Sequence, residues 1–431
     1  MKGASPSETN YPYLLTEDRS QLGDGAQARQ ARFLAQIESL SNQASFLAFG
    51  IALLLPWNAT LAAMDYFVEI FPLYKPASSF LLAVSIPMLG MQVVSFALQN
   101  IISPQVKLIG GLLLGTVISI AITIVPQIIK NQAQCYYIVL GLMIGQGCAI
   151  AFLQSSLYGI AGVSGKLTNK LMVGIGLGGV TMNVLRIICM ATLDSNDASA
   201  KVFFSIASAY LLLCTILSVI FVRSQSKAMQ FAQSDSFLNL NMSEGHKSRN
   251  DSLGQFKQVK QQQESLVNRS IKVYKVIYPF ALAVTLTYAI QYTYFPGVIL
   301  TYPVTFIHQF KWFAIGAITV QNVTDTLGRL TAGLVQCPRS LFFILCLSRL
   351  VFVATYTLFY LDIAPDFFRN DVFIVISLII FGVSCGYLGS LGMQMGTTPI
   401  CGDQGLAGTI LGFHLTLGIS IGSLFGWAFY T

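Results

Sequence analysis

The fold of this chain is decided by the stretch WFAIGAITVQNVTDTLGRLTAGLVQ, residues 312–336. The stretch is predominantly apolar and exceeds the roughly 20 residues that a membrane-spanning helix needs, yet Asp325 and Arg329 lie near its middle. A charged side chain at the centre of a bilayer costs roughly 2.5–3.5 kcal/mol on insertion scales, and such side chains face the protein interior or a wet cavity. The stretch therefore predicts a membrane-spanning helix with a polar face turned inward.

Asp325 and Arg329 are four residues apart, so they share one face of a helix with the acid before the base. Asn322 extends this polar stripe by nearly one turn. Two interpretations are open. The residues form either a self-neutralising pair that only holds neighbouring helices together, or the wall of a pocket that binds a hydroxyl-rich or charged solute.

The rest of the chain has the same membrane character. Apolar residues make up 54% and charged residues 10%, against roughly 25% charged in soluble domains. The apolar segments predict about eleven membrane-spanning helices in an all-α polytopic protein: residues 44–70, 79–100, 107–129, 134–162, 171–192 and 202–222, then 273–299, 312–336, 341–361, 371–393 and 405–430.

These segments divide the chain into four parts: a tail (1–43), an N-terminal bundle of six spans (44–222), a polar linker (223–270) and a C-terminal bundle of five spans (271–431). Two helical bundles around a central solute path are typical of alternating-access carriers with a major-facilitator-like architecture.

Basic residues predict the orientation. With the N-terminus in the cytosol, Lys107, Lys166, Lys170, Arg339 and the basic linker all lie on the cytosolic side, as the positive-inside rule requires. An odd number of spans then places the C-terminus outside the cytosol. The net charge of +7 is explained by this topology, so no nucleic-acid partner is expected. We favour the plasma membrane over an endosomal or lysosomal membrane.

The first span contains Pro56-Trp57-Asn58. Pro56 frees a backbone carbonyl and bends the helix, which places the Trp57 indole in mid-membrane beside Asn58. The indole could offer a stacking surface to an aromatic solute or simply pack. In the fourth span, the Gln154 amide could pair with the edge of a nucleobase or could bridge two helices.

Four more ionisable residues lie within or beside spans. Asp65 is either a carboxylate at a cavity mouth or a helix-end charge, and Arg186 needs a partner, for which Asp65 is one option. Arg349 could snorkel toward the cytosolic surface or close a gate. His414 could couple protons to transport, or it could be a buried histidine satisfied by hydrogen bonds.

No nucleophile–base arrangement, phosphate-binding loop or metal-ligand cluster is apparent, so an enzyme is not expected and a membrane hydrolase is the residual alternative. No cofactor and no metal are expected. Small residues do recur at helix-packing spacing. The glycine pairs are 111/115, 174/178, 382/386, 408/412 and 418/422.

Taken together, these stretches resemble the equilibrative nucleoside transporters. The resemblance is carried by Pro56-Trp-Asn58 with Asp65-Tyr-Phe67, Leu153-Gln154 with Leu157-Tyr-Gly159, Asn322-x-x-Asp325-x-x-Gly328-Arg329, Ser348-Arg-Leu-Val-Phe352, Gly386-Tyr-Leu388 and Ala407-Gly408. It covers most of residues 44–222 and 273–430. It implies a facilitative carrier of nucleosides, with nucleobases an open question.

The resemblance further implies a central cavity in which Trp57 and Gln154 address the base and Asp325 and Arg329 lie at the ribose side. The other implied lining residues are Leu54, Leu61, Phe295 and Asn322. Arg186 is similar to an arginine of many non-mammalian members. The alternatives are a proton-coupled nucleoside carrier, a major-facilitator-type carrier of another small polar solute and, least favoured, a membrane receptor without flux. Oligomeric state is left open.

Overall fold

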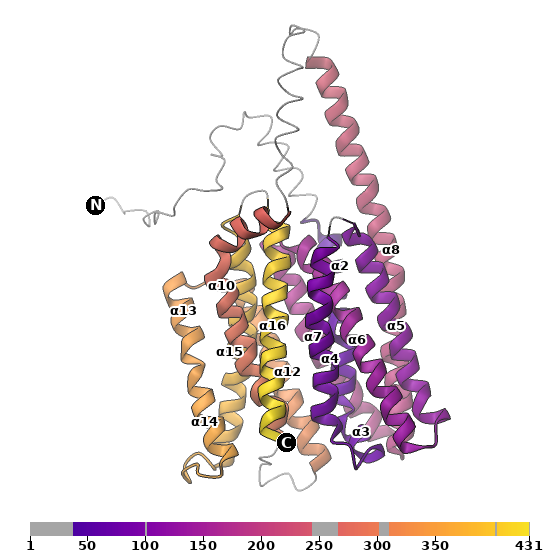
Figure 1. Ribbon diagram of the computed structural model, residues 1–431, viewed down its shortest axis with the longest axis vertical. Helices are drawn as coiled ribbons and strands as arrows, with labels where there is room; N and C mark the ends of the chain where they lie inside the picture. The colour runs from indigo at the N-terminus through magenta and orange to yellow at the C-terminus, as the bar shows by residue number, and fades with distance from the viewer. Residues whose placement is uncertain (1–37, 100, 244–265, 301–309, 401–402, 431) are drawn as a thin grey trace, which may run out of the picture.

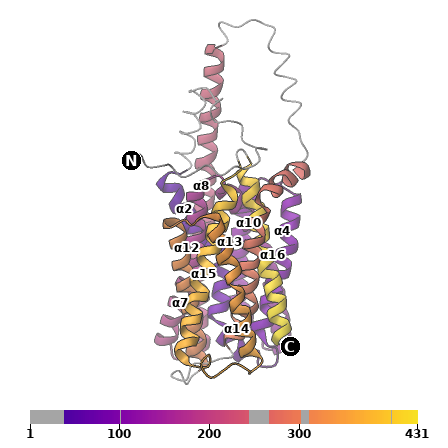
Figure 2. The same cartoon turned by 90° about the vertical axis from the view of Figure 1, so that its left-hand side faces the viewer.

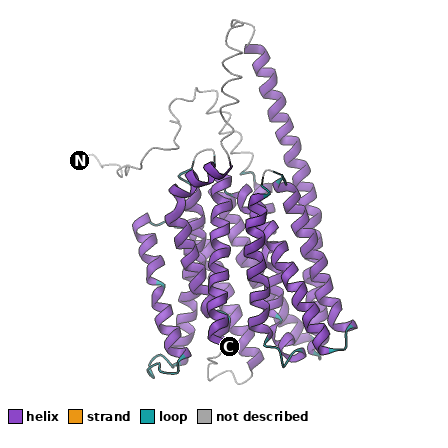
Figure 3. Ribbon diagram, in the orientation of Figure 1, coloured by secondary structure: helices purple, strands orange, loops and turns teal. Residues whose placement is uncertain are grey.

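The computed structural model describes residues 38–99, 101–243, 266–300, 310–400 and 403–430. Within these residues the regular structure is entirely helical (Figure 3). The all-α prediction is confirmed for this part of the chain.

The helices form two groups that stand side by side in Figure 1. The first group, the N-terminal half, contains α2 (Leu40–Ala62), α3 (Met64–Ile70), α4 (Pro76–Ala97), α5 (Pro104–Ile128), α6 (Gln132–Ala161), α7 (Gly165–Thr192) and α8 (Asn196–Ser243). The second group, the C-terminal half, contains α10 (Leu266–Tyr294), α11 (Gly297–Leu300), α12 (Phe310–Leu334), α13 (Arg339–Ser348), α14 (Leu350–Tyr360), α15 (Asp371–Thr397) and α16 (Gln404–Tyr430).

Ten helical segments of the described residues are long and apolar enough to cross a membrane, with α13 and α14 counted as one segment. Helix α12 has the length of a span, 25 residues, but its polar stripe of Asn322, Asp325 and Arg329 lowers its hydropathy. With α12 included, the helices agree with the prediction of about eleven spans.

Several helices begin where a polar side chain caps the first turn. Ser39, Ser103, Asn131, Ser164 and Asn370 each accept a hydrogen bond from a backbone N–H two or three residues on. Such caps satisfy N–H groups that the first helical turn leaves without partners. The starts of these five helices are therefore indicated in the sequence by a serine or an asparagine.

Helix α8 differs from the predicted boundary between span and linker. It runs as one 48-residue helix to Ser243 and projects far beyond the other helices (Figure 2). The first part of the predicted linker (223–270) is thus helical, and α10 begins inside it at Leu266. Residues 1–37, most of the predicted tail, lie outside the described residues. We call the end of the molecule from which α8 projects the linker end, and the other the C-terminal end.

Close helix contacts occur at the predicted glycine pairs. A Cβ added at Gly174 would lie 2.9 Å from the Cα of Gly50 on α2. Glycines 111, 178, 382, 386, 408, 412, 418 and 422 also meet a neighbouring helix, whereas Gly115 faces open space. In a membrane the hydrophobic effect does not drive helices together, so helix association depends on close packing, which small residues permit. These glycines therefore allow the helix packing on which both halves depend.

Glu38, just before α2, ties the start of that helix to the loop before α7. Its carboxylate accepts hydrogen bonds from the Lys166 ammonium at 2.7 Å and from the Ser164 hydroxyl at 2.6 Å. These bonds, that of Lys166 first, lower the pKa of Glu38 below its usual value. Because the folded-state pKa is depressed, the contacts stabilise the protein above the unfolded-state pKa, and this contribution is lost as pH falls through the folded-state value.

We therefore expect Glu38→Gln to lower the melting temperature slightly at neutral pH, and the difference from the wild type to shrink as the pH falls through the depressed pKa of the Glu38 carboxylate. The effect is small because the Lys166 side chain is 69% exposed, and exposed ion pairs contribute about 0–1 kcal/mol. Thermal unfolding of the detergent-solubilised protein across this pH range measures it. A difference that persists at acid pH would contradict the assignment.

Candidate functional site: a chamber at the seam between the two halves

The two halves meet along one seam. Helices α4, α6 and α7 of the N-terminal half pack against α12, α15 and α16 of the C-terminal half. The residues of the predicted site come from both sides of this seam.

A small cavity of about 20 Å³ lies at the seam beside Trp57. In this conformation it has room for about one water molecule, so the two halves must move apart before a larger solute can enter. Five helices line the cavity: α2, α4 and α6 from one half, α10 and α16 from the other. Its lining is Leu54, Trp57, Leu81, Val84, Ser85, Met88, Ile150, Tyr292 and Ile419. Ligand sites are commonly concave and mainly apolar with a few polar groups that set orientation. We call this cavity the chamber.

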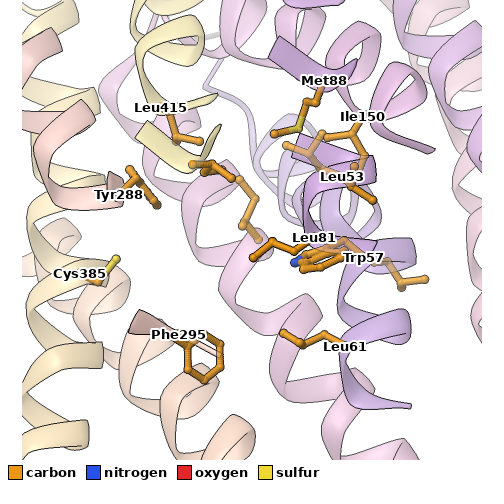
Figure 4. Close-up of a cluster of buried hydrophobic side chains, with 14 of the residues drawn as sticks. Leu53, Trp57, Leu61, Leu81, Met88, Ile150, Tyr288, Phe295, Cys385 and Leu415 are labelled. Atoms are coloured by element: carbon orange, nitrogen blue, oxygen red, sulfur yellow. The ribbon is translucent and has the colours of Figure 1, made fainter. Parts of the chain in front are cut away.

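Trp57 occupies the chamber from the N-terminal side. Its side chain is 5% exposed and follows Pro56 within α2. Figure 4 shows the indole beside Leu81, with Leu61 further along the same helix and Phe295 across from them. Leu61 and Phe295 are buried, at 4% and 5% exposure, as is Asn58 at 9%. Leu54 and Trp57 line the chamber, whereas Asn58, Leu61 and Phe295 are not part of its lining.

Asp325 and Arg329 form the ion pair that their spacing predicts. The Arg329 Nε donates to the Asp325 carboxylate at 2.6 Å, and the two side chains are only 6% and 14% exposed. The guanidinium also approaches the Met172 carbonyl on α7 at 3.4 Å and the Tyr288 hydroxyl on α10 at 3.5 Å. The pair thus neutralises itself and, through Met172, also reaches across the seam.

The pair lies close to the chamber through α10. Arg329 approaches the Tyr288 hydroxyl at 3.5 Å, and Tyr288 lies one helical turn before the chamber residue Tyr292 on α10. Asn322, by contrast, packs against α7: a Cβ added at Gly179 would lie 2.7 Å from its amide carbon. Asn322 therefore lies at the seam but outside the chamber lining.

Gln154 bridges the two halves. Its amide nitrogen donates to the Gly412 carbonyl at 3.1 Å and to the Thr416 hydroxyl at 2.9 Å, both on α16. The helix-bridging interpretation therefore describes Gln154 in this conformation. Both amide hydrogens are engaged by α16, so they can meet a solute only if the seam opens.

The seam is tightly closed toward the linker end. There α6 and α16 touch through glycines, since a Cβ added at Gly162 would lie 3.1 Å from the Cα of Gly408. The Gln394 amide on α15 donates to Asn169 on α7 at 3.3 Å. Tyr158, 2% exposed, lies between these contacts and the chamber and donates to the Met172 sulfur at 3.3 Å. A solute in the chamber is thus blocked from the linker end.

Arg186 finds the partner that the sequence suggested. Its guanidinium donates to the Asp65 carboxylate at 2.7 Å, to Asn196 at 2.5 Å and to Ser199 at 2.9 Å. These four residues belong to the N-terminal half and lie toward the end of the molecule opposite the linker end. The network joins α3, α7 and α8 rather than lining the chamber.

Arg349 and His414 are held within the C-terminal half. The Arg349 guanidinium is 1% exposed and donates to the Phe381 carbonyl at 3.0 Å, to Gln291 at 3.1 Å and to Ser384. The snorkelling alternative for Arg349 is therefore wrong, because these buried acceptors hold the charge inside. The His414 ring contacts the Thr285 hydroxyl at 3.0 Å and stacks on Tyr274.

Two polar chamber residues, Ser85 and Tyr292, were missed by sequence reasoning. A serine and a tyrosine in apolar spans carry no charge to attract notice. The weak signal for Tyr292 is its position: Tyr288 and Tyr292 recur at helical spacing on α10, and Phe295 follows just after the helix ends.

Comparisons with known proteins agree with this architecture. A family model described as "Nucleoside transporter" matches residues 139–431. Equilibrative nucleotide transporter 8 of Arabidopsis thaliana is 26% identical over 393 residues, covering 88% of this chain and 92% of the relative. Equilibrative nucleoside transporter 1 of Homo sapiens is 24% identical over 438 residues, covering 89% and 95%.

Solved structures show the fold. A D-xylose-proton symporter superposes with a TM-score of 0.60 at 12% identity, covering 90% of each chain. The nucleoside transporter NupG superposes with a TM-score of 0.51 at 10% identity, covering 89% of this chain and 90% of that one. The two-bundle architecture is therefore that of major-facilitator carriers. Since the family model spans well over half of the chain, the protein belongs to the nucleoside transporter family.

Proposed function

We propose that this protein carries nucleosides across a membrane by facilitated alternating access. The observation that carries the proposal is the chamber, which Trp57 of one half and Tyr292 of the other both line. Alternating access requires two bundles that rock around a central site. The hydrogen bonds and glycine contacts that close the linker end join the two halves directly, so rocking would break them.

The chamber suits a nucleoside in two parts. The indole of Trp57 offers a flat surface to a base, and base–aromatic stacking contributes about 1–3 kcal/mol. The ion pair, which contacts Tyr288 one turn from Tyr292, offers the Asp325 carboxylate as an acceptor for ribose hydroxyls, and hydrogen bonds to ionised groups are about twice as strong as neutral ones. Gln154 would join the base side once the seam opens.

The charge of the site supports a nucleoside rather than a nucleotide substrate. Arg329 is neutralised by Asp325 at 2.6 Å, and none of the described residues that line the chamber is charged. A phosphate would need an unpaired cationic partner. We infer that nucleoside monophosphates compete poorly with nucleosides.

The distribution of charge supports a cytosolic linker end. Lys107, Lys166, Arg269 and Arg339 lie toward that end, and Asp65 and Glu69 lie toward the C-terminal end. By the positive-inside rule the N-terminus is then cytosolic and the C-terminus extracytosolic, and we place the protein in the plasma membrane.

Uptake of radiolabelled adenosine into cells without their own nucleoside carriers tests the function. We expect saturable uptake that unlabelled uridine or inosine inhibits, and that adenosine monophosphate, glucose and amino acids do not. Inhibition by a hexose instead would indicate a carrier of another solute. The absence of any solute movement in proteoliposomes would favour the receptor alternative.

Replacing Trp57 with alanine is expected to raise the half-saturating adenosine concentration by roughly tenfold, because the stacking surface worth about 1–3 kcal/mol is lost. Trp57→Phe should retain most of the affinity, since a smaller ring still stacks. Trp427→Ala is the matched control, because Trp427 lies near the end of α16 and is 42% exposed. Equal affinity in Trp57→Ala and the wild type would remove Trp57 from the site.

A further inference from the structure

We propose that the Ser85 hydroxyl reads the nucleobase: it forms the hydrogen bond by which the chamber recognises the heteroatoms at the edge of the base. The inference rests on the proposed function, since it names a specificity-determining residue of the same site. Ser85 is a buried residue on α4, and its hydroxyl forms no hydrogen bond with the described residues.

Ser85 is 1% exposed and lines the chamber together with Trp57 and Tyr292. Its Oγ has no hydrogen-bond partner among the described residues. Buried hydroxyls are nearly always hydrogen-bonded, so an unpaired one calls for an explanation. A hydroxyl that lines a solute chamber has a simple one, namely that the solute is its partner.

Several other hydroxyls in the spans bond within their own helices, although the buried hydroxyl of Ser390 on α15 also has no partner among the described residues. Thr116, Ser208 and Thr285 donate to the carbonyl four residues back at 2.8, 2.9 and 3.1 Å. This back-bonding is the usual choice for serine and threonine in helices. Ser85 does not make the equivalent bond to Leu81, although both residues lie in α4.

The backbone of Ser85 is fixed at the seam. Its carbonyl accepts a hydrogen bond from the Ser420 hydroxyl on α16 at 2.9 Å. This bond holds the residue in place against the C-terminal half while the side chain stays unpaired. The hydroxyl is therefore positioned before any solute arrives, which reduces the entropy lost on binding.

Two polar groups of the predicted site, those of Gln154 and Asp325, are already engaged by other residues. Both hydrogens of the Gln154 amide are used by α16, and the Asp325 carboxylate holds Arg329. Among the described residues that line the chamber, the polar side chains are thus the hydroxyl of Ser85, the indole of Trp57 and the phenol of Tyr292.

A serine hydroxyl suits the edge of a base chemically. It can donate one hydrogen bond and accept others, so it can pair with an exocyclic amine, with a ring nitrogen, or with both when they are adjacent. A base stacked on Trp57 would turn its edge, not its face, toward a neighbouring side chain. A site that hydrogen-bonds a substrate group discriminates strongly against an analogue that lacks it.

The test compares adenosine with analogues that each lack one edge group: purine riboside (no exocyclic amine), 7-deazaadenosine and 1-deazaadenosine (each lacking one ring nitrogen). Inhibition of labelled adenosine uptake is measured in the wild type and in Ser85→Ala. In the wild type, at least one analogue should bind roughly three- to tenfold more weakly than adenosine, the usual effect of one hydrogen bond. In Ser85→Ala, adenosine should weaken by a similar factor and that analogue should bind as well as adenosine.

Ser119→Ala is the matched control, because Ser119 is a buried hydroxyl that pairs with Ser208 at 2.9 Å, away from the chamber. It should keep the discrimination of the wild type. Ser85→Cys, nearly the same size and a weak hydrogen bonder, replaces Ser85→Ala if alanine lowers surface expression, and Ser85→Thr should preserve discrimination.

The inference is overturned if Ser85→Ala retains the full discrimination of the wild type, or if the wild type shows none. It is also overturned if both Ser85→Ala and Ser85→Cys fail to reach the surface while Ser85→Thr also loses discrimination. A wild type that does not take up adenosine overturns the proposed function and this inference together. Adenosine uptake with unchanged discrimination overturns only the role of Ser85.

Discussion

Replacing Arg329 with alanine is expected to reduce adenosine uptake by about tenfold or more at equal surface expression. The change leaves the Asp325 carboxylate, whose side chain is only 14% exposed, without its counter-charge. Removing one partner of a buried pair costs roughly 3–5 kcal/mol. It also removes the contact of the guanidinium with the Met172 carbonyl at 3.4 Å across the seam.

Two further variants separate a role in transport from a role in holding helices together. Asp325→Asn combined with Arg329→Gln leaves no unpaired charge, so folding and surface expression should recover. If the ion pair contacts the solute, uptake should stay low in this double variant. Recovery of uptake would instead support the interpretation that the pair only joins helices.

Arg369→Ala is the matched control for Arg329→Ala. Arg369 pairs with Asp362 at 3.0 Å near the C-terminal end, and the two side chains are 45% and 80% exposed, far more than those of Arg329 and Asp325. Its loss should leave uptake within about twofold of the wild type, because exposed pairs contribute little. If Arg329→Ala gave the same uptake as the wild type, the role assigned to Arg329 would be wrong.

The second large effect is expected at Gly408, where α16 touches α6. A Cβ added there would collide with the carbonyl oxygen of Tyr158 and lie 3.1 Å from the Cα of Gly162. Both obstacles are backbone, so the helices must move apart. Overpacking of this kind costs roughly 1–3 kcal/mol, which would shift the balance between closed and open linker ends by about 5- to 150-fold.

We therefore expect Gly408→Ala to hold the linker end open and to slow uptake strongly. Labelling by a membrane-impermeant maleimide applied from the linker side reports the opening. The reporter is Asn169→Cys in a chain without its eight native cysteines, since Asn169 contacts Gln394 across the seam in this closed conformation. Labelling should be faster in Gly408→Ala than in the reporter alone.

The control is Gly141→Ala on α6, because a Cβ at Gly141 would meet nothing within 4 Å. The same chemical change should there leave both uptake and labelling near wild-type values. Unaltered labelling in Gly408→Ala would contradict the assignment of the α6–α16 contact as a closure of the seam.

Residue spacing was enough to predict the Asp325–Arg329 pair, since four residues along a helix bring two side chains to one face. It was also enough to name Asp65 as an option for Arg186, as a buried cation needs an anion nearby. It could not choose between the two interpretations of Gln154, because its partners Gly412 and Thr416 are over 250 residues away in the chain.

Sequence by itself determined that this is an all-α membrane protein with a charged stripe in α12 and the motifs of the nucleoside transporter family. Those properties depend on composition and on the helical repeat, which act within one segment. Only the tertiary structure decided that Arg349 is buried rather than snorkelling, that the seam closes at Gly162 and Gly408, and that Ser85, with its unpaired hydroxyl, lines the chamber. The physical reason is that the partner of a helix face is chosen by packing between segments far apart in the chain, and no local period encodes that choice.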